Sequence, residues 1–171
     1  MKKDEIIEQI SADVKIFLKA HPHSEFYALA FDCNTEYAEF LVCMNTQAAF
    51  LETLRQYREK DGAYRTNETV IRELRYNPGD WDDTDISEIE LFSEEELAEK
   101  YGNDLEKQCA EILQLCEELL CAFCRTETFK SIPKTQDFIA FCIDHDEDPE
   151  DALARVDLGR RKDRGETRSH S

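Results

Sequence analysis

The sequence predicts a single α+β domain in which helices pack against a mainly antiparallel sheet. Apolar residues at helical spacing are interspersed with short aromatic and β-branched runs, and the two kinds of segment neither alternate strictly nor segregate. A chain of 171 residues with 41% hydrophobic residues can bury one core without disulfides or a structural metal. We expect one domain over residues 1–158 and a basic, disordered tail over residues 159–171.

The first half of the chain predicts a helix, a β-hairpin and a second helix. Residues 3–20 carry apolar side chains at spacings of three and four, as an amphipathic helix requires. Residues 25–32 and 37–44 are aromatic and β-branched runs separated by a short polar segment, which predicts two paired strands. The first run is almost continuously apolar, so we expect it to be buried on both faces. Asn45-Thr46 can cap the next helix, which ends near Asp61-Gly62.

The middle of the chain contains a segment of ambiguous structure, a turn and the start of a helix. Residues 69–76 fit either a strand or a helix. The segment Asn77-Pro78-Gly79-Asp80 is typical of a turn. Ser93 followed by Glu96 matches a capping box, which predicts a short helix ending at Tyr101-Gly102.

The last part of the domain predicts a long helix, a strand and a short helix. The helix covers about residues 104–126 and has one apolar face. Residues 137–144 form the strand, and their continuous apolar character predicts a central place in the sheet. An acidic loop and a short helix through Leu153 and Val156 follow.

The charge balance favours a basic protein as the partner. The chain has 21 Lys and Arg against 39 Asp and Glu, a net charge of −18. Such a surface repels nucleic acid and anionic lipid, so we expect neither nucleic acid nor a membrane as a direct partner. It also accelerates the encounter with a positively charged protein. The alternative is that the acids serve solubility alone.

The cysteines predict a reducing compartment. Their number, seven, is odd, and the acidic amphipathic N-terminus does not resemble a secretory signal. No stretch reaches the length of a membrane span, so we expect a cytoplasmic protein with free thiols. Cys121 and Cys124 have the spacing of a redox or zinc pair. Because they fall within the long predicted helix and no second pair accompanies them, we expect buried structural cysteines instead.

The stretch from Asp80 to Glu96 is the most acidic part of the chain, with nine Asp and Glu residues and no basic residue. Trp81, the only tryptophan, lies at its start. Its side chain either packs at the end of the core or contacts a basic partner, as aromatic residues in binding hot spots do. For such a partner we expect contacts with Trp81, Asp80, Asp82, Asp83, Asp85, Glu88 and Glu90.

Neither a metal centre nor a catalytic centre is predicted. Clustered carboxylates such as Asp80 to Asp85 can bind hard cations, but an EF-hand register here lacks the glycine at the sixth loop position. Among four histidines only His145, at the end of a strand among acids, has the position of a site residue, and an exposed loop residue is its simpler interpretation. The common hydrolase and phosphate-binding motifs are absent from the sequence. We therefore expect no enzyme activity and no cofactor.

Four segments, in this order, resemble the bacterial domain-of-unknown-function family 4303. They are Phe26-Tyr-Ala-Leu-Ala-Phe-Asp32, the helix from Thr46 to Tyr57 that follows the hairpin, Arg75-Tyr-Asn-Pro-Gly-Asp-Trp81, and the late strand with its acidic exit from Phe138 to Asp148. The resemblance extends to about Leu158. The family has no assigned activity, but some members look like neighbours of polymorphic toxins, so the resemblance implies a candidate immunity protein.

These observations support three hypotheses. The first is an immunity-type protein that binds and neutralises a cognate, basic, nuclease-like toxin domain, because carboxylates can cover the substrate groove of such a toxin. The second is a general interaction or regulatory module with another partner. The third is a metal-dependent hydrolase that uses the clustered aspartates and His145.

Overall fold

The computed structural model describes the backbone of residues 2–163 and the side chains of residues 2–156. It shows an α+β domain built on one four-stranded sheet with the strand order β3-β2-β1-β4. The elements follow in chain order: α1 (Lys3–Ala20), β1 (Phe26–Asn34), β2 (Glu39–Thr46), α2 (Gln47–Lys60), α3 (Ala63–Thr66), α4 (Glu68–Tyr76), the 3-10 helix η1 (Pro78–Asp80), β3 (Asp83–Glu90), α5 (Glu94–Tyr101), α6 (Leu105–Phe123), α7 (Glu127–Ser131), β4 (Lys134–Asp144) and α8 (Pro149–Asp163).

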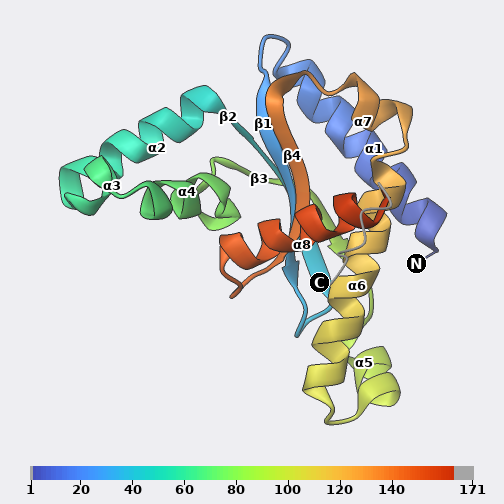
Figure 1. The fold of residues 1–171 in the computed structure, drawn as a ribbon. Helices are drawn as coiled ribbons and strands as arrows, with labels where there is room; N and C mark the ends of the chain where they lie inside the picture. The colour runs from blue at the N-terminus through green and yellow to red at the C-terminus, as the bar shows by residue number, and fades with distance from the viewer. Residues whose placement is uncertain (1, 164–171) are drawn as a thin grey trace, which may run out of the picture.

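Helices cover both faces of the sheet (Figure 1). On the first face, α1 and α6 pack over a core that includes the stacked rings of Phe31 and Phe40, whose centroids lie 4.6 Å apart. On the second face, α2, α4 and α8 pack over a core centred on Tyr27 and Phe141. Because β1 contributes to both cores, its apolar run is buried almost throughout, as the sequence predicts.

The sheet is mostly antiparallel, but β4 does not occupy the central place that its composition predicts. It lies at an edge and runs parallel to β1, with Leu29 opposite Ala140. The chain reaches this position through α5, α6 and α7, of which α6 packs along the first face (Figure 1). Since α6 and α8 both contact β4, an edge strand is here covered on both faces, which explains its apolar character.

The strand β3 is an element that the sequence analysis missed. It pairs antiparallel with β2, with Phe40 opposite Ile89, and forms the other edge of the sheet. Ser87 and Ile89 are buried, whereas Asp85, Glu88 and Glu90 are exposed. The excess of acids conceals this alternation in the sequence, and a register shift between Val42 and Met44 interrupts it further.

The ambiguous residues 69–76 form the helix α4, which Asn67 caps by accepting hydrogen bonds from the backbone N–H groups of Thr69 and Val70. The predicted turn at Asn77 becomes the short helix η1. At the C-terminus, α8 continues to Asp163, past Leu158, where the sequence analysis places the end of the domain. Residues 164–171 of the predicted tail lie outside the described residues.

One tyrosine joins α4 and η1 to the sheet. The Tyr27 hydroxyl donates to the Arg75 carbonyl over 2.6 Å, and the Trp81 indole N–H donates to the same oxygen over 3.1 Å. The Asn45 amide in turn donates to the Tyr27 oxygen over 3.0 Å. The Arg75 guanidinium lies 3.9 Å from the centroid of the Tyr27 ring, and it also donates to Gln47 and Asp137. The segment from Arg75 to Trp81 is thus held against β1 by both backbone and side chain.

All seven cysteines are free thiols. Burial in the protein interior raises the pKa of the Cys124 thiol to about 11. The expectation that Cys121 and Cys124 are both buried is wrong, because Cys121 is exposed and accepts a hydrogen bond from Arg125, and Cys124, the C-cap residue of α6, is only partly buried. The buried face of α6 ends with Leu119, Leu120 and Phe123, which leaves Cys121 outside it. Within the described residues, no helix is both long and apolar enough to cross a membrane.

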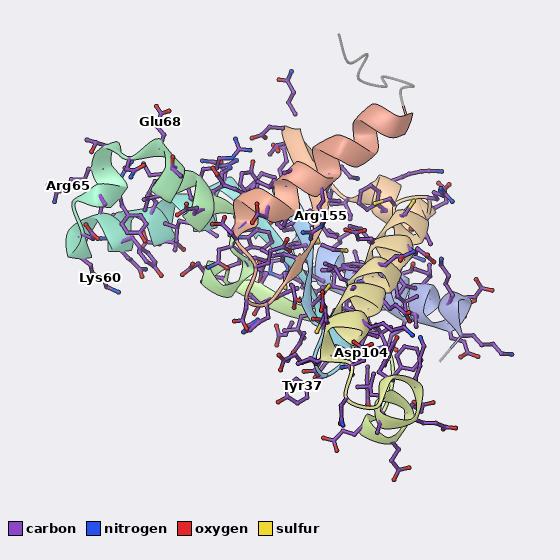
Figure 2. All side chains as sticks on the ribbon, turned by 60° about the horizontal axis from the view of Figure 1, so that its bottom comes forward. Tyr37, Lys60, Arg65, Glu68, Asp104 and Arg155 are labelled. Carbon is purple, nitrogen blue, oxygen red and sulfur yellow. The ribbon has the colours of Figure 1, made fainter. Side chains whose placement is uncertain are left out.

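We predict that Tyr27→Phe lowers the free energy of unfolding by about 1 to 2 kcal/mol, because it leaves the buried Asn45 amide without its acceptor and removes one donor from the Arg75 carbonyl. Urea denaturation followed by circular dichroism measures the change. Tyr37→Phe is the matched control, since Tyr37 is 58% exposed and projects from the turn between β1 and β2 (Figure 2). Equal stability of the two variants would show that the Tyr27 hydroxyl contributes nothing.

Candidate functional site

The structure separates the seven predicted contact residues into three places. Asp80 and Trp81 lie on the second face of the sheet, against the core around Tyr27. Asp82, Asp83 and Asp85 lie at the beginning of β3, beside α1, and Glu88 and Glu90 lie at its end. The acidic stretch therefore does not form one patch.

Trp81 is a core residue, which is the first of its two interpretations. Its side chain is only 6% exposed, and its ring meets the rings of Tyr27 and Phe141 edge to face at centroid distances of 6.1 and 6.2 Å. Because its indole N–H donates to the Arg75 carbonyl and its ring is buried, Trp81 leaves little surface for a partner. Asp80 is also engaged within the domain.

The Asp80 carboxylate accepts hydrogen bonds from two side chains of its own domain. The Tyr57 hydroxyl donates to one oxygen, and the Asn77 amide donates to the other over 2.7 Å. The hydrogen bond to Asp80 raises the pKa of Tyr57 to about 12. Because both oxygens are used internally, Asp80 fixes the approach of α2 to η1 rather than presenting its charge to a partner.

A groove of about 350 Å³ lies between α1 and β3, and we call it the α1–β3 groove. Its lining residues are Asp13, Ile16, Phe17, His21, Asp83, Asp85 and Ile86. The Ser87 hydroxyl donates to Asp13 over 2.7 Å and joins the two walls. Burial raises the pKa of Asp83, while His21 lowers it and the neighbouring carboxylates of Asp82 and Asp85 raise it again. The groove thus combines apolar side chains with three carboxylates.

A second depression, the Asp32 groove, lies at the carboxyl ends of the parallel strands β1 and β4, where many sheets bind ligands. It consists of two hollows of about 170 and 200 Å³ that share Asp32 and His145. Glu88 and Glu39 line the first hollow, and the segment from Asn77 to Gly79 lines the second. Asp32 Oδ1 lies 3.6 Å from His145 Nδ1. Burial raises the pKa of Asp32, and the imidazole opposes this rise.

The loop that carries His145 is held in place from three sides. The backbone N–H of His145 donates to the Cys33 carbonyl over 2.8 Å and to the Asp144 carboxylate over 2.9 Å. The Thr35 hydroxyl donates to the other oxygen of Asp144 over 2.6 Å. Arg155 of α8, near the centre of Figure 2, binds both oxygens of Glu147 and donates to the Cys142 carbonyl over 3.0 Å. The backbone of His145 is therefore fixed, whereas its side chain is 66% exposed.

The clustered aspartates do not converge on a metal site. Among the described residues, no group of three or more His, Cys, Asp and Glu side chains is placed so that it could hold a metal ion. Asp80, in η1, turns towards Tyr57, whereas Asp83 and Asp85 of β3 line the α1–β3 groove. His145 instead contacts Asp32, which lies far from them in the sequence.

The acids of the Asp80 to Glu96 stretch share one property, which is that none of the nine forms an ion pair with a described side chain. Elsewhere cations are paired within the domain, as Arg55 is with Glu52 and Glu59. Glu96 accepts a hydrogen bond from the backbone of Ser93, as the predicted capping box requires. The carboxylates of β3 thus carry charge that the described part of the domain does not neutralise.

The sequence analysis missed two residues that complete these grooves. Asp32 ends the apolar run of β1, and a lone acid at the end of a buried strand is the signal that could have identified it. Ile16 departs from the apolar stripe of α1 and is 66% exposed, so its position outside the stripe was a usable signal.

We predict that Asp32→Asn raises the free energy of unfolding at pH 7.5. Burial raises the folded-state pKa of Asp32, so its stabilising contribution is complete below the unfolded pKa and is lost as the pH rises through the folded pKa. The gain from the neutral amide should therefore shrink as the pH falls towards 4, which urea denaturation across this range measures. The exposed Asp82→Asn is the control. A less stable Asp32→Asn protein at pH 7.5 would mean that the contact with His145 outweighs the cost of burial.

Comparison with known proteins identifies the family. No curated protein and no solved structure shows a significant match to the chain. Residues 6–159 match a domain of unknown function, DUF4303, and this span includes every residue of the two grooves. The match covers most of the 171 residues, in agreement with the four segments that resemble this family. The chain therefore belongs to the DUF4303 family.

Proposed function

We propose that this protein is an immunity-type inhibitor, which binds a basic, nuclease-like toxin domain and blocks it. The observation that carries the proposal is the set of carboxylates between Asp82 and Glu90 that lack an ion-pair partner among the described side chains. The net charge of −18 supports it, because the field of such a domain attracts a positively charged protein over long distances.

The same charge explains how the protein would inhibit a nuclease. A nuclease binds the phosphates of its substrate through Lys and Arg side chains, so its substrate groove is positively charged. Carboxylates on β3 can occupy these cations in place of the phosphates, and the substrate is then excluded by competition. β3 is an edge strand that α1 contacts, and among the described residues no further strand pairs with its outer side.

We propose a smaller set of contact residues than the seven expected from the sequence. Trp81 and Asp80 are used within the domain, so we now assign the contact to five acids of β3 and the segment before it. Asp82, Asp85, Glu88 and Glu90 are exposed, and Asp83 is partly buried.

A general interaction module with a different basic partner remains the second candidate, because the unpaired carboxylates support it equally well. Gene context separates the two, since an immunity gene lies next to the gene of its toxin. No observation favours the metal-dependent hydrolase, as the described aspartates do not converge with His145.

We predict that the protein copurifies with the product of the adjacent reading frame and that the double variant Asp82→Lys, Asp85→Lys binds it at least about 100-fold more weakly, because like charges then face each other across the contact. The control is Glu25→Lys, Glu99→Lys, which alters the net charge equally at two other exposed acids. Titration calorimetry at two salt concentrations measures both affinities.

Equal losses in the two double variants would show that net charge alone, and not the β3 surface, determines binding. Absence of any complex with the adjacent product would contradict the immunity function.

A further inference from the structure

The α1–β3 groove has an apolar side that solvent can reach. Ile16 is 66% exposed, the highest value among the large hydrophobic side chains that the structure describes. Phe17 and Ile86 beside it are partly buried and belong to the edge of the first core. A single exposed isoleucine is common on protein surfaces, but Ile16 also lines the groove and so offers apolar surface to a side chain that enters it.

Three carboxylates flank this apolar side. Asp13 uses one oxygen to accept from Ser87, whereas Asp83 and Asp85 accept no hydrogen bond from a described side chain. Asp83 is partly buried, and the carboxylates of Asp82 and Asp85 lie near it. A cation bound among these three aspartates would lower the free energy of their charged forms. The only basic side chain among the described lining residues is His21, whose imidazole lowers the pKa of Asp83, so the carboxylates outnumber the basic groups of the groove.

An arginine or lysine side chain has the matching construction, because it joins an apolar stem to a cationic head. We propose that the α1–β3 groove receives an Arg or Lys side chain of a basic protein partner, with the stem against Ile16 and Ile86 and the head between Asp83 and Asp85. This assignment rests on the proposed function and names the place where the partner engages β3. The volume of about 350 Å³ is large enough for one such side chain.

The Asp32 groove is the less suitable receptor for a cation. Its buried carboxylate already has the imidazole of His145 at 3.6 Å, and the hollows on either side are smaller, at about 170 and 200 Å³. In the α1–β3 groove the Nδ1 atom of His21 lies 2.9 Å from the Phe17 carbonyl, and among the described residues His21 forms no ion pair with Asp83 or Asp85. Asp83 and Asp85 therefore remain available there.

The test uses a capped tri-arginine peptide as the probe and backbone amide chemical shifts as the readout. We expect the shift changes to fall on residues 13–21 and 83–87. Ile16→Ser should weaken binding about three- to tenfold, because it removes apolar contact without a change in charge. Leu51→Ser is the matched control, since Leu51 is 52% exposed on α2, outside the groove, and this variant should bind as the unchanged protein does.

A second pair of variants tests the carboxylates. Asp85→Asn should weaken tri-arginine binding about two- to fivefold, whereas Glu99→Gln on α5 should leave it unchanged. Shift changes spread over the whole acidic surface, or centred on Asp32 and His145, would overturn the proposal, as would equal effects of Ile16→Ser and Leu51→Ser.

The same variants separate the groove from the immunity function. If the product of the adjacent reading frame binds Ile16→Ser as tightly as the unchanged protein, the groove assignment fails and the proposed function stands. If that product does not bind at all while tri-arginine still occupies the groove, the immunity function fails and the groove assignment stands.

Discussion

The carbonyl oxygen of Arg75 accepts hydrogen bonds from Tyr27 and from Trp81, and the second face of the domain depends on this junction. The carbonyl belongs to the last turn of α4, where helices leave such groups without an internal partner. By satisfying it, Tyr27 ties the end of α4 to an inner strand of the sheet, and η1 follows in a fixed position. The beginning of β3 and one wall of the Asp32 groove are placed by the same contact.

Local patterns predict the helices of this fold well and the positions of its strands poorly. The Ser93 and Glu96 capping box and the apolar face of α6 are determined by neighbours in the sequence, and both are confirmed. The edge position of β4 is not a local property, because it depends on the route of α5, α6 and α7 across the sheet. Likewise β3 becomes a strand through its pairing with β2, against the low strand propensity of its acids.

The candidate site shows the same limit at the level of single residues. Composition identifies the acidic stretch, but it does not reveal the register of β3 with β2, which is shifted between Val42 and Met44 and determines where each carboxylate lies. Asp85 therefore lines the α1–β3 groove, whereas Glu88 lines the Asp32 groove. Trp81 illustrates the converse, since a residue that composition places in an acidic surface turn is held inside the core by the Arg75 carbonyl. Its hydrogen-bond acceptor lies six residues earlier in the chain, and nothing in the local pattern reveals it.

The parallel pairing of β1 with β4 also has a consequence for biosynthesis. Leu29 lies opposite Ala140, so one side of β1 has no strand partner until nearly the whole domain has left the ribosome. Until then the hairpin of β1 and β2 exposes apolar side chains that later belong to two cores. A truncated or stalled chain would carry this surface unprotected, which makes premature termination before β4 a route to aggregation.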